Sequence, residues 1–348
     1  YLLFRDANWS PDFPTTAMLL RTLYHEETGV MVDGIVTVDL HALRYIVGAL
    51  APLRLPNAPE PLTEANVLEQ VKALWGQPEA GETITDVGLN QWWGQRKNFI
   101  PALAASVLAK VQSGDIDYVA LAMAVERSLN ERAIQIWLAE EHAATQLATL
   151  GWDGRLRVDA TRDYLSLIDT NMGYNKANAV IERSLHYTVT WPTNGAPAEA
   201  TVTIDYRHPI TLPNHTCDIT PRYGSDYQDL VERCFFNYVR LYVPQGSTLV
   251  EATGFLENDS VRTARGERRT QVFAGYFVLP PGEQARIQFR YQLPPLLTQE
   301  NYQLIVQRQA GSGPLSLVVT IAGERQEMVV REGITTVPSP SWGGLGRG

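Results

Sequence analysis

The sequence predicts an α/β domain followed by an all-β sandwich, because the spacing of its apolar residues changes once along the chain. Up to about residue 151, runs with helical spacing alternate with short apolar runs typical of buried strands. Beyond Asp163, apolar and polar residues alternate, as in residues 187–191 and 200–204, which is the pattern of half-buried strands. We therefore predict an α/β domain over 1–151, a linker over 152–163, a β-sandwich over 164–335 and a flexible tail over 336–348.

The composition is that of a globular protein. With 348 residues, of which 45% are hydrophobic and 19% charged, the chain can hold two ordinary domains. It has no run of about eighteen apolar residues, so no membrane span is expected within it. Residues 1–163 hold 13 Lys+Arg against 21 Asp+Glu, which is −8 of the total net charge of −9. This acidic balance excludes a general nucleic-acid binder.

The first expected element is a short strand at residues 1–4, which breaks into Arg5 and Asp6. A charged pair at the carboxyl end of a buried strand lies where open α/β sheets bind ligands. Residues 8–14 form an exposed loop. A helix follows, capped by Thr15 or Thr16 and ended by Gly29, with an apolar stripe of Leu19, Leu20, Leu23 and Tyr24.

The remaining elements of the first domain continue the alternation of helix and strand. A helix from Asp115 should face the core with Val119, Ala122, Met123 and Val125. In chain order, we expect a strand at 34–38, a helix at 40–50, a strand stub at 53–55, a helix from the Thr63 cap to about 75, a helix from about 89 to 113 that turns Leu103, Val107 and Val111 to one face, the Asp115 helix, a strand at 133–138 and a helix at 140–150 ended by Gly151.

In the second half we expect roughly nine short strands between Tyr164 and Val330 and no convincing helix. Asn194-Gly195, Pro281-Gly282 and Gly323-Glu324 separate paired runs as hairpin turns do. A sandwich of the immunoglobulin-like type fits this spacing best.

Cys217 and Cys234 are the only cysteines, and they flank what reads as a long loop running into a strand. A disulfide is the simplest interpretation; it would stabilise the fold by about 3 kcal/mol and imply an oxidising compartment. Two buried thiols are the alternative. A metal site that combines Cys217 with His208 and His215 is a third, although its spacing matches no standard zinc pattern.

Several other conspicuous residues have a structural interpretation. Asp33 and Asp39, which flank a strand, read as turn and cap residues. Trp92 and Trp93 can stack on sugars or pack on lipid, but adjacent tryptophans more often bridge core and surface, and we favour packing. The histidines suggest no triad with a serine, and the sequence has no G-x-S-x-G, H-E-x-x-H, P-loop or G-x-G-x-x-G motif. No catalytic group is identified.

Five segments of the sequence resemble segments of a known family and occur in the same order. They are RDANWSPDFPTTA, VDGIVTVDLHAL, LTEANVLE, RKNFIPALAASVL and the DTNMG of residues 169–173. In these phrases the chain resembles an uncharacterised bacterial envelope family called domain of unknown function 4012. The resemblance implies an extracytoplasmic, membrane-anchored protein, in which a transmembrane helix and the start of the α/β domain precede Tyr1.

More distantly, residues 1–138 resemble the LytR-CpsA-Psr phosphotransferases, which move glycopolymers from a polyprenyl-pyrophosphate carrier onto the cell wall. The shared order is a strand ending in Arg-Asp, a helix, a strand ending in Val-Asp and a helix opened by a basic cluster. The resemblance implies a three-layer α/β domain, incomplete here at its N-terminus. Arg5 and Asp6 match that family's Arg-Asp, and Arg96 matches the last arginine of its arginine-rich motif.

The sequence departs from that motif at three positions. Asn90 and Trp93 stand where the motif has an acidic residue and another arginine, and Lys97 replaces a glutamine. A pyrophosphate bound with Mg²⁺ usually needs several arginines and a carboxylate that holds the metal. A site this depleted binds weakly or does not catalyse, unless upstream residues complete it.

Arg5, Asp6 and Arg96 are therefore the candidate phosphate site, with Asp6 as a weak candidate for a metal ligand. The structural alternative is an ion pair between Arg5 and Asp6 that organises the loop. No cofactor is certain, and Mg²⁺ is the one that this site suggests.

Three functions follow from the sequence and its resemblances. The first is a degenerate, non-catalytic binder of envelope glycan, polyprenyl-phosphate carrier or envelope proteins, located outside the cytoplasm. The second is an active glycopolymer phosphotransferase completed by upstream residues. The third is a structural subunit of a surface or membrane assembly that docks through its sandwich.

Overall fold

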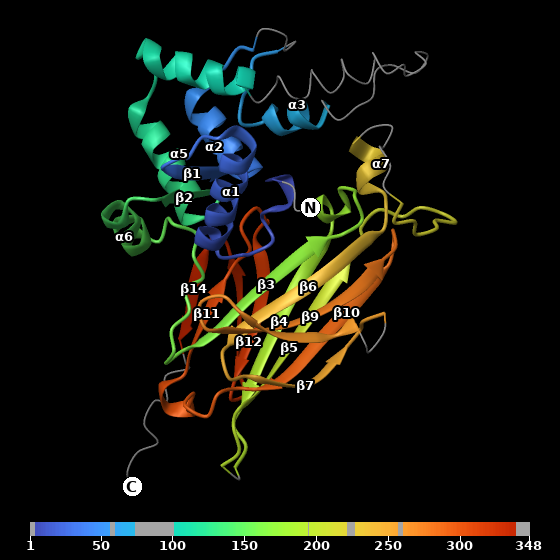
Figure 1. Cartoon of the computed structure of the whole chain (residues 1–348). Helices are drawn as coiled ribbons and strands as arrows, with labels where there is room; N and C mark the ends of the chain where they lie inside the picture. Colours follow the sequence, from blue (N-terminus) through green and yellow to red (C-terminus); the bar gives the residue numbers. More distant parts are fainter. Residues whose placement is uncertain are drawn as a thin grey trace.

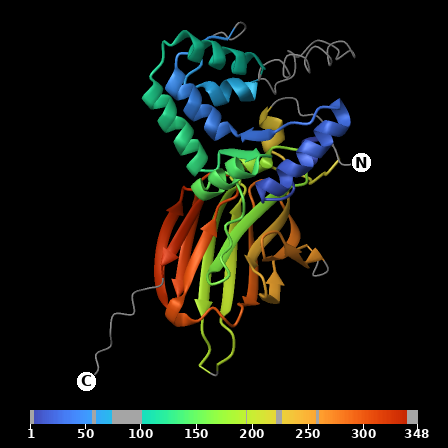
Figure 2. The same cartoon turned by 60° about the vertical axis from the view of Figure 1, so that its left-hand side comes forward.

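The computed structural model describes residues 4–55, 60–73, 101–193, 195–220, 227–256 and 260–338, and for Arg5 and Asn301 it describes the backbone only. These residues form a helical unit with a small sheet and, beneath it, two packed β-sheets (Figure 1). The helical unit sits on one end of the sandwich, as the turned view also shows (Figure 2). Among the described residues, no helix is long and apolar enough to span a membrane.

The first unit contains a two-stranded antiparallel sheet, β1 with β2, surrounded by helices. The described part of this unit thus has no parallel sheet, and the three-layer arrangement that the phosphotransferase resemblance implies is not seen. In chain order its elements are η1 (Phe4–Asp6), α1 (Phe13–Thr28), β1 (Gly34–Val38), α2 (Leu40–Leu50), α3 (Val67–Ala73), a helix over 101–113, α5 (Tyr118–Asn130), β2 (Ile134–Leu138) and α6 (Glu141–Leu150).

Local signals placed most of these elements correctly. Helix α2 has the predicted bounds, because the Asp39 side chain accepts the N–H groups of His41 and Ala42 at 2.8 and 2.9 Å. Helices α1 and α6 end as predicted at Gly29 and Gly151, both in the left-handed conformation that glycine adopts without strain.

Several predictions for the first unit are wrong. Phe4 belongs to a 3-10 turn rather than a strand, so Arg5 and Asp6 do not follow a described strand. In helix α1 the N-cap position is Asp12, whose side chain makes no capping hydrogen bond, instead of Thr15 or Thr16. Its buried face uses Phe13, Ala17 and Leu20, whereas Leu19 and Tyr24 are exposed. Residues 53–55 form no strand, although Leu53 makes an isolated bridge to Leu62, and α3 starts at Val67 instead of next to Thr63.

Helix α5 turns a different face to the core than predicted. Its cap is Asp117, and Val119 and Met123 are 69% and 64% exposed, because the helix packs on α2 through its opposite side. Ala122 is exposed too, whereas Val125 is partly buried. In the helix over 101–113, by contrast, Leu103 is buried and Val107 and Val111 pack on the same cluster, as predicted.

The second unit consists of two six-stranded sheets, ordered β13-β12-β4-β5-β10-β7 and β14-β11-β3-β6-β9-β8. Parallel pairs, β3 with β11 and β4 with β12, join strands far apart in sequence, which an all-antiparallel immunoglobulin sandwich lacks. The strands are β3 (Asp163–Asn171), β4 (Glu182–Thr190), β5 (Glu199–Arg207), β6 (Phe235–Pro244), β7 (Thr248–Thr253), β8 (Arg262–Gly266), β9 (Thr270–Leu279), β10 (Gln284–Gln292), β11 (Gln303–Gln307), β12 (Leu315–Ile321), β13 (Glu324–Val330) and β14 (Ile334–Pro338).

The sandwich core is formed by the alternate residues that each strand turns inward. In β5, for example, Ala200, Val202, Ile204 and Tyr206 are buried, whereas the residues between them are half-exposed. The predicted hairpin turn at Gly323-Glu324 connects the paired strands β12 and β13. Pro281-Gly282 instead connects β9 to β10, which belong to different sheets, so the hairpin predicted there is wrong. Asn194 lies outside the described residues. Residues 336–338 of the predicted tail form part of edge strand β14.

Cys217 and Cys234 form the predicted disulfide, with an S–S distance of 2.00 Å. The free-thiol and metal alternatives are therefore excluded for these two residues. The bridge ties the segment after β5 to the start of β6, and a short helix, α7 (Tyr227–Val231), lies between the two cysteines where only loop was predicted. His208 instead hydrogen-bonds through Nε2 to the Arg233 carbonyl, at 3.1 Å.

Candidate functional site

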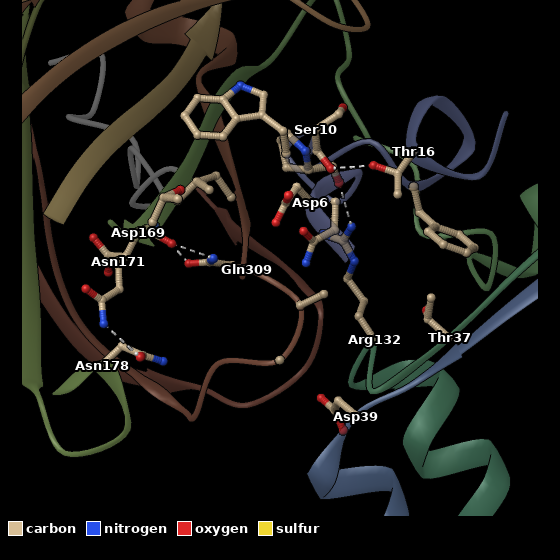
Figure 3. Close-up of a pocket in the computed structure, with 18 of the residues that line it drawn as sticks. Asp6, Ser10, Thr16, Thr37, Asp39, Arg132, Asp169, Asn171, Asn178 and Gln309 are labelled. Carbon is tan, nitrogen blue, oxygen red and sulfur yellow. Dashed lines mark hydrogen bonds between the residues drawn. The ribbon is translucent and has the colours of Figure 1, made fainter. Parts of the chain in front are cut away.

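A cleft of about 1460 Å³ lies between the two units. Polar side chains from both units face this space: Asp6, Ser10, Thr16, Thr37, Asp39 and Arg132 from the helical unit, and Asp169, Asn171, Asn178 and Gln309 from the sandwich (Figure 3). The cleft exceeds the range of about 300–1,000 Å³ that holds a drug-sized molecule. Its size and its mixed lining make it the candidate site.

The segment DANWSPDFP, residues 6–14, connects the units at the edge of the cleft. Asp12 is 1% exposed, and its carboxylate accepts the Leu156 N–H at 3.0 Å and the Thr15 hydroxyl at 2.8 Å. It also pairs with Arg268 of the sandwich at 3.1 Å. Ser10 donates to Glu267, next to that arginine. A buried carboxylate persists only with such partners, so Asp12 fixes this loop against the sandwich.

Trp9, in the same loop, forms an aromatic platform on the sandwich. Its ring stacks with Tyr238 of β6 at 5.8 Å between centroids and 26° between planes. The guanidinium carbon of Arg240, two residues further along β6, lies 4.1 Å from the Trp9 ring centroid. The indole nevertheless remains 48% exposed and lines the cleft, so it is held rigidly and is still accessible to a ligand.

Arg132 and Arg308 hold the two units together reciprocally. Arg132 donates to the carbonyl of Arg308 at 3.2 Å and to that of Gly154 at 2.6 Å, and Arg308 donates to the carbonyl of Glu131 at 2.6 Å. Burial lowers the pKa of Arg132 to about 10, which still leaves it protonated at neutral pH. The wall of the cleft is thus built by contacts between the units.

A second loop, at the end of β3, faces the cleft from the sandwich. Asn171 donates to Asn175 Oδ1 at 2.8 Å and accepts the Gly173 N–H at 3.0 Å, which folds the loop tightly. Gly173 is required there, because a Cβ would lie 2.6 Å from Phe236. Tyr174 then has φ of +52° and is 68% exposed on the cleft, an unusual conformation for a large side chain.

The carboxylates of the cleft are mostly engaged by the protein. Asp169 accepts Tyr206 and Asn237 at 2.7 Å each and pairs with Arg183. Asp39 caps α2. Asp6 is exposed and lines the cleft. Among the described residues, no group of three or more His, Cys, Asp or Glu could hold a metal ion.

The sequence-predicted site is only partly placed. Asp6 lines the cleft, as a ligand-contacting residue would. The side chain of Arg5 and the whole of Arg96 lie outside the described residues, and so do Asn90, Trp92, Trp93 and Lys97, so the convergence of the two guanidiniums stays a prediction. The Mg²⁺ role of Asp6 stays a prediction.

Sequence reasoning missed Trp9, Tyr174 and Arg240. The segment DANW contains Trp9, and the segment DTNMG directly precedes Tyr174. Both segments contribute to the family resemblance, but neither was predicted to contact a ligand. A usable signal was present, because each loop places an aromatic ring directly beside an asparagine, Trp9 after Asn8 and Tyr174 before Asn175, away from any apolar periodicity. Arg240 lies in a strand and gave no signal of its own.

Known proteins are similar to parts of this chain. The family model described as "Protein of unknown function (DUF4012)" matches residues 1–73, which hold the first three of the five phrases quoted above. No curated protein matches. Among solved structures, a mutant two-domain M1 zinc metallopeptidase with L-tryptophan bound is similar at 13% identity and a TM-score of 0.16, over 46% of this chain. The chain spans 40% of that structure's length, and a TM-score this low carries no argument.

Proposed function

We propose that this protein binds a glycan of the cell envelope in the cleft, outside the cytoplasm and without catalysing a reaction on it. One observation carries the proposal. Two loops from different units each present an exposed aromatic ring and an exposed amide to the cleft, Trp9 with Asn8 and Tyr174 with Asn178. An exposed thioether, Met172, lies beside the second pair.

This combination suits a sugar chain. Aromatic rings offer flat apolar surfaces to the C–H faces of sugar rings, and they lose little conformational freedom in doing so. Amide side chains both donate and accept hydrogen bonds, as sugar hydroxyls require. A cleft larger than a drug-sized ligand favours a segment of a polymer over a single small molecule.

The arrangement of the carboxylates supports binding of a glycan rather than its hydrolysis. Glycoside hydrolysis uses two carboxyl groups flanking the scissile bond, one of them free to act as an acid. Of the acids that line the cleft in the described residues, Asp169 already accepts three side-chain partners and Asp39 caps a helix, whereas Asp6 is the exposed one. One exposed carboxylate does not make such a pair.

The extracytoplasmic location rests on the disulfide. The Cys217–Cys234 bridge closes a segment with a sequence separation of 17, and bridges of this structural kind persist in oxidising compartments.

The test uses Tyr174→Ala, because this side chain is exposed and its loss leaves the core intact. Losing one stacked aromatic should weaken glycan binding by about 1–2 kcal/mol, or about five- to thirtyfold. Tyr118→Ala is the matched control, since Tyr118 is 59% exposed on α5 and does not line the cleft. The wild type would first be screened on an array of bacterial envelope oligosaccharides, and the hits titrated by calorimetry. Equal affinity of the two variants, or no binding to any glycan at millimolar concentration, contradicts the proposal.

A second candidate function is that of a structural subunit in an assembly, because α5 has an exposed apolar surface. Tyr118, Val119 and Met123 are all more than half exposed along the outer side of α5, and monomers rarely expose a large contiguous apolar patch. Sedimentation velocity of the wild type and of Val119→Glu tests it. Concentration-dependent association that the glutamate abolishes would favour a subunit.

The third candidate function, an active glycopolymer phosphotransferase, is tested by a separate experiment. It needs Arg5 and Arg96 to contact the phosphates of a polyprenyl-phosphate carrier, so Arg5→Ala or Arg96→Ala should each weaken carrier binding about tenfold or more. Unchanged affinity in both variants rules this function out.

A further inference from the structure

Two arginines in the wall of the cleft, Arg132 and Arg240, carry charge that no carboxylate neutralises directly. Each side chain is 5% exposed, and each has an Nε without a hydrogen-bond partner. Within the described part of the chain, neither guanidinium lies within ion-pair distance of an acid. Buried charge without a counter-ion is costly, so its presence at a cleft calls for an explanation.

Arg240 is held by neutral groups. Its Nη2 donates to the Thr170 hydroxyl at 3.2 Å, its Nη1 lies 3.4 Å from the Tyr242 hydroxyl, and Trp9 covers its guanidinium face. Burial lowers the pKa of Arg240, yet an arginine stays protonated in a protein. The carboxylate of Glu267 favours its charge from a distance, beyond Tyr242, and offsets part of it.

Arg132 is likewise bound to backbone carbonyls rather than to acids. Asp12 and Asp153 are the acids that favour its charge, but both are already matched by other arginines. Asp12 pairs with Arg268 at 3.1 Å, and Asp153 pairs with Arg155 and, at 3.1 Å, with Arg157. The positive charge of Arg132 is thus left largely uncompensated.

The acids on the cleft do not restore the balance. Asp169 has Arg183 as its own partner, and Asp39 is stabilised by the N–H groups of α2. Asp6 is exposed, so water screens its negative charge. Arg132 and Arg240 are buried, and their positive charges act over a longer distance because the dielectric constant is lower in the protein interior. The resulting field in the cleft favours a negative group near Trp9 and Arg240.

We propose that the glycan in the cleft is acidic, and that its carboxylate or phosphate group lies on the Trp9 side, where Arg240 selects it. This inference rests on the proposed function, because it names the class of glycan for the same cleft. It uses residues different from Arg5, Asp6 and Arg96. The cation beneath Trp9 also draws electron density from the open face of the indole, which disfavours a second cation there and favours an anionic group.

The experiment compares acidic sugar chains with a neutral one. The wild type is titrated with oligogalacturonate, with a phosphodiester-linked sugar polymer and with neutral maltohexaose, and separately with inorganic phosphate. Arg240→Met removes the charge at similar volume, Arg240→Lys keeps the charge, and Arg286→Met is the control, since Arg286 lies exposed on the far sheet in a pair with Asp205. Thermal unfolding of each variant confirms that it is folded before binding is compared.

We expect the wild type to bind at least one acidic polymer about tenfold or more tightly than the neutral one, with an affinity that falls as salt is raised. Arg240→Met should lose this preference, so that it binds acidic and neutral polymers about equally, and Arg286→Met should behave as the wild type. Arg240→Lys should retain most of the preference. Response to the galacturonate alone identifies a carboxylate as the group that is recognised, and response to the phosphodiester polymer alone identifies a phosphate.

Different failures have different meanings. Equal binding of acidic and neutral polymers overturns the acidic preference and leaves the glycan cleft standing. Equal loss of acidic and neutral binding in Arg240→Lys and Arg240→Met shows that Arg240 only supports Trp9, which also overturns it. If Arg240→Met does not fold, the salt dependence and ligand preference of the wild type decide the matter. Binding of phosphate that depends on Arg240, without binding of any glycan, refutes the proposed function but keeps the anionic subsite.

Discussion

Asp163 should make the sandwich less stable as the pH rises from about 4 to 6. This carboxyl group begins β3, has no exposed surface and accepts the Tyr164 N–H at 2.7 Å. The hydroxyls of Tyr187 and Tyr302 also donate to it and lie 3.0 Å from each other. Burial raises the pKa of Asp163 from 3.8 to about 6, because these hydrogen bonds offset only part of the lost hydration.

The sign of the effect follows from the two protonation states. The unfolded chain ionises Asp163 near its ordinary pKa of 3.8, whereas the folded protein keeps it protonated up to about pH 6. The stability that this group contributes is therefore complete below about pH 4 and is lost as the pH rises through 6. At 1.36 kcal/mol per pKa unit, the shift corresponds to about 2–3 kcal/mol between pH 4 and pH 7.

The assay is urea unfolding at constant ionic strength between pH 4 and pH 7, for the wild type and for Asp163→Asn. The asparagine cannot ionise, so the difference in free energy of unfolding between the two proteins should shrink or reverse by about 2–3 kcal/mol over this range. Asp115→Asn is the control, because Asp115 lies on the surface beside Lys110 and its pKa is lowered by that hydrogen bond. A wild-type-to-variant difference that is constant with pH would falsify the reasoning, since Asp163 would then be ionised in the folded state.

The disulfide and the interface between the units give two further predictions. Replacing both Cys217 and Cys234 by serine should lower the free energy of unfolding by about 3 kcal/mol, and reducing the wild type with dithiothreitol should lower the urea midpoint equally; identical midpoints would refute it. Asp12→Ala should cost about 2 kcal/mol, because the Leu156 N–H loses its acceptor while the half-exposed Arg268 regains water. Limited proteolysis within 151–162 should also be faster in this variant, and an unchanged cleavage rate would show that Asp12 does not hold the units together.

The sequence by itself determined the features that depend on residues close together in the chain. Asp39 caps α2 and Gly29 ends α1, because a cap involves only the next few N–H or C=O groups. The change to period-two alternation near residue 160 placed the sandwich strands, and the lone pair of cysteines indicated the disulfide. Such signals need no knowledge of what the element packs against.

Only the tertiary structure decided which surfaces are covered and which residues meet. Val119 and Met123 have helical spacing but face solvent, since periodicity identifies an apolar face without identifying a neighbour to bury it. Trp9 reaches Arg240 only because the helical unit docks on the sandwich, and the Asp12 to Arg268 pair spans the same junction. The cleft arises from contacts between residues more than a hundred positions apart, and no local propensity encodes such distances.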